Sequence, residues 1–287
     1  MGEHRQDKPE AAAEEGTTPE KRLPAGRKAE LTSYVSEVGQ VTVAKLASHF
    51  AVSTDTIRRD LDQLDADGLL IRTHGGAVSL AASNRPDTEL EVRLHVQTAA
   101  KETIGRLAAS LAEDGSVIML NGGTTTLALA RHLHKLRNLT VATNNLRIPS
   151  EISPAVVRDL YVFGGSVSTV TQTTTGPVSL RLATGGHDIE VQADIAFIGV
   201  GAVSVEGGYT TSNVGDAAMM QAMMNRASRV AILADSAKFD RHLFAQVAAL
   251  HAVDYLVCET APSEELLAAL HDGGVEVVTP ESSRRLT

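Results

Sequence analysis

Tryptophan is absent from this 287-residue chain, other aromatic residues are few, and Cys258 is the only cysteine. A single cysteine excludes a disulfide within the chain and any metal site built from several thiolates. We therefore expect a reducing, cytoplasmic environment. Cys258 itself ends the apolar run VDYLVC, which indicates a small buried residue in a strand.

Long apolar runs are also missing. The longest ones, such as residues 196–203, contain glycines and fall far short of the roughly 20 residues that a membrane-spanning helix needs. We expect no membrane span. Residues 1–26 are rich in Glu, Ala, Pro and Lys and hold no apolar segment, so they predict a disordered tail and not a signal peptide.

Basic residues are fewer than acidic ones, with 26 Lys or Arg against 35 Asp or Glu, so the net charge is −9. The acidic excess lies outside residues 21–80, which carry eight Lys or Arg and seven Asp or Glu. Binding to nucleic acid depends on where local basic groups point. An acidic total is therefore compatible with DNA binding, although it limits nonspecific affinity.

Residues 41–69 predict a helix-turn-helix. Thr42 is a typical N-cap of a first helix, and a turn at residues 51–52 leads to a second N-cap, Ser53. Gly68 is expected to end the second helix. Helical spacing puts one apolar face on each helix: Val43, Leu46, Ala47 and Phe50 on the first, and Ile57, Leu61 and Leu64 on the second.

The outer face of the second helix is rich in hydrogen-bond donors. A helix in the major groove of DNA uses such side chains, because Arg pairs bidentately with guanine or phosphate and hydroxyls suit phosphate oxygens. A solvated helix face with two arginines fits the same residues equally well. The candidates for DNA contacts here are Thr54, Thr56, Arg58, Arg59 and Gln63, with Thr42 and Ser53 at the helix starts and Lys28 in a preceding helix.

Residues 69–78, LLIRTHGGAV, favour the DNA-binding interpretation, since they predict two short strands around a basic tip. Gly75 and Gly76 are expected to turn the backbone through positive φ close to the DNA surface, and both are candidate DNA contacts. Arg72 and His74 would then reach a phosphate or the minor groove. The whole element is predicted to be a winged helix-turn-helix.

After the wing, residues 79–88 contain Pro86 and small polar residues and predict a linker. One long helix is expected from about residue 89 to Gly115. Strands and helices then alternate, which predicts a doubly wound, mostly parallel sheet covered on both faces. Strands are expected at residues 117–120, 139–143, 161–163, 193–200, 230–234, 255–258 and 275–278, and helices at 127–133, 214–228 and 263–271.

The loop after the first of these strands has the outline of an anion cradle. Its residues are Asn121, Gly122, Gly123, Thr124, Thr125 and Thr126. Glycines permit close backbone approach, N–H groups at a helix start attract anions, and threonines add neutral donors. It lacks the lysine of a P-loop, so a nucleoside triphosphate is not expected. A plain strand-to-helix turn capped by threonine accounts for the same residues as well.

Other strands also end in polar residues or glycines, at the edge where open α/β sheets bind ligands. These residues are Thr143, Asn144, Asn145, Gly164 and Gly165. Lys238, beyond another strand, suits an anionic ligand, although such a lysine is more often solvated. Asp216 lies in the first turn of the helix at 214–228, whose Met219, Met220, Met223 and Met224 we expect in core or subunit packing.

The blocks TIRRDL and RTHGGAV resemble the N-terminal domain of the DeoR family of bacterial transcription regulators. NGGTTTLALARHL, VFGGSVS and ADSAKF resemble the DeoR-type sensor domain, whose fold is similar to that of sugar-phosphate isomerases. The resemblance implies DNA binding and a phosphorylated sugar or related metabolite as effector. It places the phosphate at Gly123, Thr124, Thr125 and Thr126, and the sugar near Asn144, Gly164, Gly165 and Lys238.

Two residues depart from the family pattern, which usually has Asp at the position of Asn121 and commonly Glu at that of Asp216. Asn121 removes a negative charge beside the expected phosphate, and Asp216 withdraws its carboxylate by about one methylene. Both changes bear on the identity of the effector. Neither affects the predicted fold.

The sequence thus predicts a DNA-binding transcription regulator, a repressor of a carbohydrate-metabolism operon that a phosphorylated sugar releases from, or alters on, its double-stranded operator. The predicted parts are a disordered tail (1–26), a winged helix-turn-helix (27–79), a linker (80–98) and an α/β sensor domain (99–287). Because such readers use paired half-sites, a homodimer or homotetramer is expected.

The alternative is a sugar-phosphate isomerase-like enzyme fused to a DNA-binding module. Proton transfer would need a carboxylate base, for which the loops offer only Asp216 and Glu206. No cofactor is expected. The ten histidines are too scattered to predict a metal site.

Overall fold

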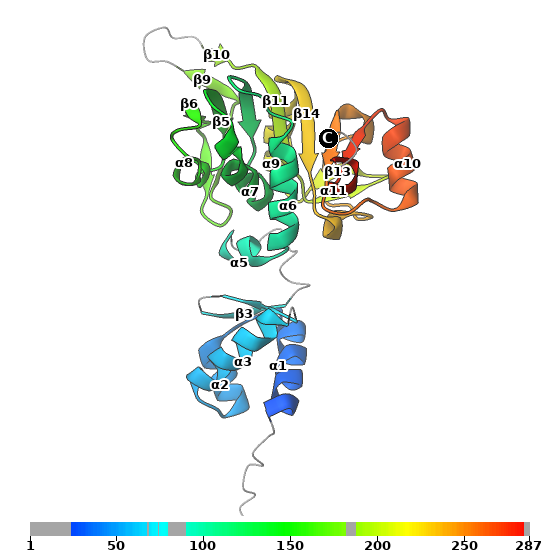
Figure 1. The fold of residues 1–287 in the computed structure, drawn as a ribbon. Coiled ribbons are helices and arrows are strands. Elements are labelled where there is room, and N and C mark those ends of the chain that lie inside the picture. The colour runs from blue at the N-terminus through cyan, green and yellow to red at the C-terminus, as the bar shows by residue number, and fades with distance from the viewer. Residues whose placement is uncertain (1–23, 68, 74, 80–89, 182–187, 284–287) are drawn as a thin grey trace, which may run out of the picture.

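The computed structural model describes residues 24–67, 69–73, 75–79, 90–181 and 188–283. Figure 1 shows a helical N-terminal part with a small sheet, and a larger C-terminal part in which helices flank a twisted sheet. Most of the predicted tail, Gly68, His74 and residues 80–89 of the predicted linker lie outside the described residues.

Three helices form the N-terminal part: α1 (Pro24–Val38), α2 (Val43–Phe50) and α3 (Thr54–Ala66). Both predicted N-caps are present. Oγ1 of Thr42 accepts a hydrogen bond from N of Lys45 at 3.3 Å, and Oγ of Ser53 accepts one from N of Thr56 at 3.1 Å. Ala51 is left-handed (φ 51°) and ends α2 in a sharp turn. The predicted helix-turn-helix is confirmed.

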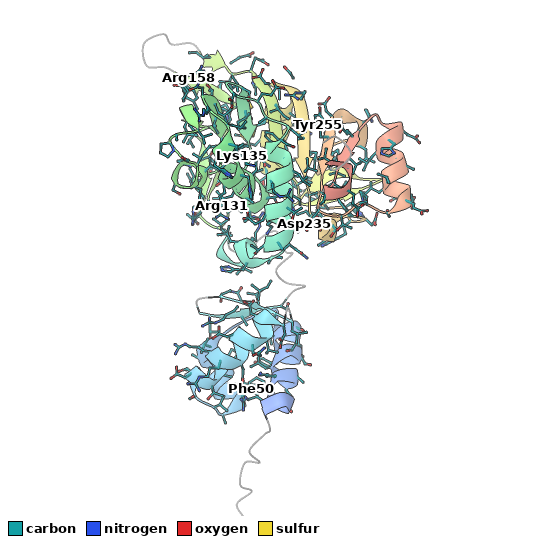
Figure 2. The ribbon with its side chains drawn as sticks, in the orientation of Figure 1. Phe50, Arg131, Lys135, Arg158, Asp235 and Tyr255 are labelled. Carbon is teal, nitrogen blue, oxygen red and sulfur yellow. The ribbon has the colours of Figure 1, made fainter. Side chains whose placement is uncertain are left out.

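The inward faces of these helices pack into one apolar cluster, to which Phe50 belongs (Figure 2). The residues that the sequence predicted to face inward on α2 and α3 are all buried: Val43, Leu46, Ala47, Phe50, Ile57, Leu61 and Leu64. Leu31 and Val35 of α1 complete the cluster. Burying one such side chain contributes roughly 1.5–3 kcal/mol, so this small core fixes the orientation of α3.

The wing is an antiparallel sheet in the strand order β1-β3-β2. Its strands are β1 (Gln40–Thr42), β2 (Ile71–Arg72) and β3 (Gly76–Val78). The sequence did not predict β1, and β1 explains why Gly76 is a glycine: a Cβ there would lie 1.9 Å from the carbonyl oxygen of Val41. The expected positive φ at Gly76 was wrong, because close approach of two strands is the constraint.

The helix expected from about residue 89 to Gly115 is broken. α5 (Leu90–His95) and α6 (Thr98–Ala109) are separated by a turn in which Gln97 is left-handed (φ 51°). The expectation of one continuous helix was therefore wrong. α5 lies within the predicted linker, on the side of the larger part that faces the wing (Figure 1).

Seven parallel strands form the central sheet in the order β17-β16-β14-β11-β4-β5-β6. They are β4 (Val117–Leu120), β5 (Leu139–Thr143), β6 (Val157–Val162), β11 (Ala193–Gly199), β14 (Ala227–Leu233), β16 (Tyr255–Val257) and β17 (Glu276–Val278). Each expected strand is present within a few residues. The predicted parallel α/β domain is confirmed.

Helices cover both faces of this sheet, and β11 shows why its strands are apolar throughout. Ile195 and Phe197 join the core under α6 and α7 (Thr124–His132). Ala196 and Ile198, which point the other way, join the core under α9 (Val214–Met224). The four methionines of α9 are buried in that core. α9 ends before residue 228, the expected end, because β14 begins at Ala227.

Shorter elements surround the central sheet. They include additional strands, which the sequence did not predict. They are the hairpins β7 (Ser166–Ser168) with β8 (Thr173–Thr175) and β9 (Ser179–Arg181) with β10 (Asp188–Glu190), and the sheet of β12 (Ala202–Ser204), β13 (Gly208–Thr211) and β15 (Ala245–Ala248). The remaining α-helices are α8 (Ile148–Glu151), α10 (Glu264–Asp272) and α11 (Pro280–Ser283). Across the described ranges, no helix is long and apolar enough to cross a membrane.

Candidate DNA interface and ligand cavity

The outer face of α3 presents polar side chains to solvent. The exposed candidates on it are Thr54, Arg58, Arg59 and Gln63. Nη1 of Arg58 donates to Asp55 at 2.8 Å, and Nε2 of Gln63 donates to Asp67 at 3.1 Å. Both contacts are exposed and contribute little to stability. A phosphate or a base edge can therefore replace these carboxylates at small cost.

Three of the predicted hydroxyl donors are already engaged. Thr42 and Ser53 cap their helices, and the hydroxyl of Thr56 lies 2.9 Å from that of Ser53. Lys28 is half-buried on α1, whereas a Cβ at Gly75 would meet no atom within 4 Å, so Gly75 borders open space. These residues remain predicted DNA contacts, of which Gly75 is the least obstructed.

Arg72 is held against α3. Its guanidinium pairs with Asp62, and its backbone N–H donates to Oδ1 of Asp65 at 3.0 Å. The sequence predicted that Arg72 and His74 together reach the DNA from the wing tip. The structure gives Arg72 a partner on α3, and His74 lies outside the described residues. Contact of Arg72 with DNA stays a prediction.

Sequence reasoning missed a buried ion pair between α1 and α3. Nε of Arg27 lies 2.6 Å from Oδ2 of Asp60, and the two side chains are 13% and 8% exposed. The hydrogen bond to Asp60 raises the pKa of Arg27. Asp60 lies among the apolar residues of the inward face, and an acidic residue in that position is the signal that indicates a buried partner.

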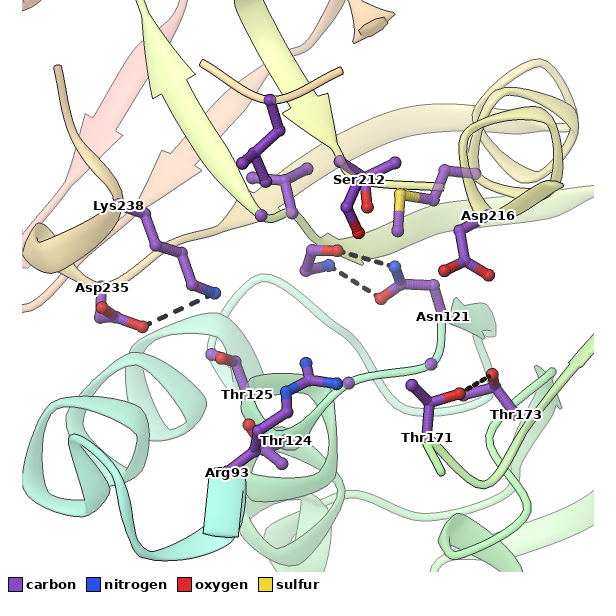
Figure 3. Close-up of a pocket in the computed structure, with 18 of the residues that line it drawn as sticks. Arg93, Asn121, Thr124, Thr125, Thr171, Thr173, Ser212, Asp216, Asp235 and Lys238 are labelled. Atoms are coloured by element: carbon purple, nitrogen blue, oxygen red, sulfur yellow. Dashed lines mark hydrogen bonds and ion pairs between the residues drawn. The ribbon is translucent and has the colours of Figure 1, made fainter. Parts of the chain in front are cut away.

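A cavity of about 140 Å³ lies at the carboxyl ends of the central strands. Its walls come from the segments after β4, β5, β11 and β14, from α9, and from α5 and α6 (Figure 3). β4, β11 and β14 are neighbours in the sheet. Their loops therefore meet over its middle, where open α/β sheets bind ligands.

Eight predicted ligand residues line this cavity: Asn121, Gly122, Gly123, Thr124, Thr125, Asn144, Asp216 and Lys238. Five others do not: Thr126, Thr143, Asn145, Gly164 and Gly165. The hydroxyl of Thr126 donates to the carbonyl of Asn121 at 2.8 Å, and that of Thr143 donates to the carbonyl of Leu120 at 2.7 Å. Nδ2 of Asn145 donates to the carbonyl of Gly123 at 3.1 Å. These three side chains shape the loops of the cavity.

Gly164 and Gly165 were expected on the same rim, and the structure places them away from it. They follow β6, which is the edge strand, so their loop lies two strands away from β4. Gly165 has a φ of 131°, and a Cβ there would lie 2.2 Å from the carbonyl oxygen of Thr175. Close packing against β8 explains this glycine.

Four cationic side chains line the cavity, of which the sequence indicated only Lys238. Arg241 is one of them, and its Nη1 donates to the carbonyl of Ala237 at 3.3 Å. Arg93 enters from α5 and Lys101 from α6. Figure 3 shows Arg93 and Lys238 pointing into the same space from different sides. Arg93 and Lys101 precede the sheet along the chain, so a search of the strand ends does not find them.

Two carboxylates moderate this positive charge. Oδ2 of Asp235 lies 3.6 Å from Nζ of Lys238. Burial raises the pKa of Asp216, whereas the positive charge of Arg93 lowers it and so opposes that rise. Burial lowers the pKa of Lys238 and of Arg93, and a guanidinium stays charged nonetheless. Cations that have lost hydration favour binding of an anion.

The affinity of the cavity for a dianion is expected to fall as pH rises above about 7. Burial, and then the nearby charge of Lys238, lower the pKa of Lys101 from 10.5 to about 7. A bound dianion favours the protonated ammonium, so binding weakens as Lys101 loses its proton. Sulfate stays dianionic, so its dissociation constant between about pH 6 and about pH 9 measures this effect. A flat profile would contradict the prediction, and a Lys101→Met variant should show a flatter one.

The opposite wall offers hydrogen-bond groups. α7 begins at Thr124 with Gly123 as an N-cap that makes no side-chain bond, so the positive end of the helix faces the cavity. Nδ2 of Asn144 donates to the carbonyl of Thr174 at 2.7 Å. Its Oδ1 is buried and, among the described residues, has no hydrogen-bond partner. An unpaired acceptor on a residue that lines the cavity suits a hydroxyl donor on a ligand.

Asn121 ties two strand ends together. Its Nδ2 donates to the carbonyl of Gly199 and its Oδ1 accepts from N of Gly199, both at 2.8 Å. An aspartate accepts hydrogen bonds but cannot donate one when ionised. The amide therefore joins the two strand ends through a donated and an accepted hydrogen bond, which an ionised carboxylate cannot do. It also carries no charge, unlike an aspartate in the cavity wall.

Asn121→Asp is expected to weaken binding of inorganic phosphate, because it adds a negative charge to the wall and loses the bond to the carbonyl of Gly199. Isothermal titration of phosphate into both proteins measures the change. Asn138→Asp, which adds the same charge at an exposed position outside the cavity, is the matched control. Equal affinities in wild type and Asn121→Asp would show that this wall does not face the anion.

Comparison with known proteins decides what these two parts are. Residues 27–82 match the DeoR-like helix-turn-helix domain, and residues 96–260 match the DeoR C terminal sensor domain. The chain belongs to the DeoR family. The resemblance predicted from the TIRRDL, RTHGGAV and NGGTTT blocks is thereby confirmed.

Relatives in this family match along most of their length. The HTH-type transcriptional regulator GlpR of Haloferax volcanii is 30% identical over 89% of this chain and 98% of its own. The HTH-type transcriptional repressor GlcR of Bacillus subtilis is 30% identical over 88% and 94%, and the glycerol-3-phosphate regulon repressor of Escherichia coli is 26% identical over 85% and 94%. These relatives are transcriptional regulators and not enzymes, and the DeoR-family chain is a DNA-binding transcriptional regulator.

Solved structures with a similar fold include ribose 5-phosphate isomerase A from Methanocaldococcus jannaschii (18% identity, TM-score 0.32, covering 48% of this chain and 53% of that chain). Another is the eIF2B-beta2-delta2 complex from C. thermophilum (14% identity, TM-score 0.43, covering 88% and 96%). Scores this low support no substrate and no activity. Among the described residues of the DeoR-family chain, no group of three or more His, Cys, Asp or Glu is placed to hold a metal ion.

Proposed function

We propose that this DeoR-family protein represses genes of carbohydrate or polyol metabolism, and that a phosphorylated sugar or polyol in the cavity releases it from its operator. The observation that carries the proposal is the convergence of four cationic side chains on one cavity. Asn144 also lines this cavity, and its Oδ1 is a buried acceptor without a hydrogen-bond partner among the described residues. Cations suit a phosphate, and the acceptor suits a sugar hydroxyl.

The names of relatives agree with this class of ligand. One is a glycerol-3-phosphate regulon repressor and another a putative aga operon transcriptional repressor, both from Escherichia coli. Fold similarity alone would not support such an inference. The cationic cavity supplies the independent support from this chain's own residues.

Release follows when the ligand prefers an arrangement that DNA does not bind. Shifting such an equilibrium from 1:99 to 99:1 takes roughly 10⁴-fold preference. We propose a dimer or tetramer, because two recognition helices then match two half-sites of the operator. The ligand would act by changing how well the two α3 helices match that spacing.

A thermal-shift screen against phosphorylated sugars and polyols, including glycerol 3-phosphate, tests the proposal. A ligand at 100 times its dissociation constant adds roughly 2.7 kcal/mol to a domain that binds it only when folded. Each hit is then titrated into the protein bound to DNA from upstream of its own gene. A hit that dissociates the DNA supports the proposal, and a hit that leaves operator affinity unchanged rejects the release mechanism.

Arg59→Ala is expected to weaken operator binding by ~1 to 3 kcal/mol if Arg59 reads a base, or to reduce the salt dependence of binding if it contacts a phosphate. Fluorescence anisotropy with labelled DNA at several salt concentrations distinguishes the two cases. Arg137→Ala removes an exposed arginine of the sensor domain and serves as the control. If Arg59→Ala and Arg137→Ala behave alike, α3 does not lie in the major groove as assigned.

A further inference from the structure

Two consecutive residues of α5 face different parts of the molecule: one packs on the wing and the next lines the cavity. Val92 is 1% exposed and packs with Ile71 and Val78 of the wing, joined by the partly buried Val96. The next residue, Arg93, lines the cavity. α5 also contacts both β2 of the wing and α7, the helix that begins at the cavity.

The sensor domain holds α5 at both ends. N of Leu90 donates to the carbonyl of Val170 at 3.1 Å, and Val170 precedes Thr171 in the cavity wall. At the other end, Nζ of Lys101 donates to the carbonyls of Arg93 and Val96, both at 2.5 Å. Lys101 thus satisfies carbonyls that a helix C-terminus leaves without partners.

This contact pattern gives Lys101 a role different from that of Arg93. The ammonium of Lys101 is committed to the end of α5, so it acts on the ligand through Arg93 and through its charge. The guanidinium of Arg93 makes no side-chain hydrogen bond recorded among the described residues, and it points into the cavity (Figure 3). Lys101 is a positioning residue, and Arg93 is the group that meets the anion.

We propose that α5 transmits ligand binding from the cavity to the wing. A bound anion attracts the guanidinium of Arg93, and α5 moves together with Arg93. The packing of Val92 on Ile71 and Val78 then changes. The inference rests on the proposed function, since it needs an anion in the cavity. The break at Gln97 makes α5 a separate short helix, which stays tied to α6 through Lys101. The wing strand β3 pairs with β1 beside the start of α2, so a change at Val78 reaches the DNA-binding surface.

Hydrogen exchange of the full chain, with and without inorganic phosphate, tests this inference. Phosphate is expected to slow exchange at residues 121–126 and in α5, and to change exchange at Ile71 and Val78 at least twofold. In Val92→Ala the response at residues 121–126 should persist while the response of the wing is lost. Ile71→Val, a milder change on the wing side, should reduce the wing response if Val92→Ala fails to fold.

Val205→Ala is the matched control, because it removes the same two methyl groups from a valine that is 40% exposed and far from α5 in the chain. It should keep both responses. A phosphate response at residues 121–126 without any response at the wing of the wild type would overturn the role of α5. The same conclusion follows if Val92→Ala or Ile71→Val keeps the full wing response. No response at residues 121–126 would instead reject the anion cavity and, with it, the proposed function.

Discussion

Replacing Arg93 by alanine is expected to weaken binding of the phosphorylated effector by roughly 10- to 150-fold, because a hydrogen bond to a charged group contributes about 1.5–3 kcal/mol. Arg93 brings a buried guanidinium to the cavity, where charge is less screened than in bulk water. The loss also leaves Asp216 without the cation that opposes the rise of its pKa. The dissociation constant of a hit from the thermal-shift screen measures the change.

Arg93→Lys separates the effect of the charge from the effect of the guanidinium geometry. It keeps the charge but loses the planar fork of donors, so an intermediate affinity is expected. The melting temperature without ligand should change little in either variant, since Arg93 contributes to no apolar core. Ligand affinity that is unchanged in Arg93→Ala would place the phosphate elsewhere in the cavity, against Lys238 or the start of α7.

Ile57→Ala is expected to cost the DNA-binding domain ~2 to 5 kcal/mol, because it opens a hole in a fully buried position. The core of this domain is small and separate from the two cores of the sensor domain. A loss of that size approaches the total stability of a small domain, so operator binding should disappear at 37 °C or below. Calorimetry should show a lower melting temperature for the unfolding transition of the DNA-binding domain.

The sensor domain provides the internal control for Ile57→Ala. Its thermal shift with ligand should be that of the wild type, because the cavity lies in another core. Ile57→Val is expected to cost only ~0.5 to 1.5 kcal/mol and to retain DNA binding. Val38→Ala, at a position 41% exposed, should leave both transitions in place. If Ile57→Ala binds DNA normally, the helix-turn-helix core is not what orients α3.

The cavity shows how far reasoning along the chain reaches. Gly122, Gly123, Thr124 and Thr125 were found because parallel strands bring their carboxyl ends to one edge, and a strand-to-helix turn there is recognisable locally. Gly164 was misplaced by the same rule. The rule gives the edge of the sheet but not the order of the strands, and β6 proved to be the outermost one.

The sequence by itself determined the features that arise from spacing over a few residues. Thr42 and Ser53 cap helices, Ile57 and Leu61 face inward, and the apolar strands of the sheet are buried, because the helical and strand periods dictate these outcomes locally. The family resemblance rests on the same local blocks. Neither depends on which distant segments meet.

Tertiary structure alone decided the rest. Arg93 and Lys101 reach the cavity because the chain breaks at Gln97 and folds α5 back over the strand ends, and no local pattern encodes that reversal. Gly76 is required by β1, a strand more than thirty residues earlier in the chain. Asn121 matters through Gly199, 78 residues later. Contacts across such separations are set by the packing of whole layers, and this packing, not the sequence period, placed the charges around the cavity.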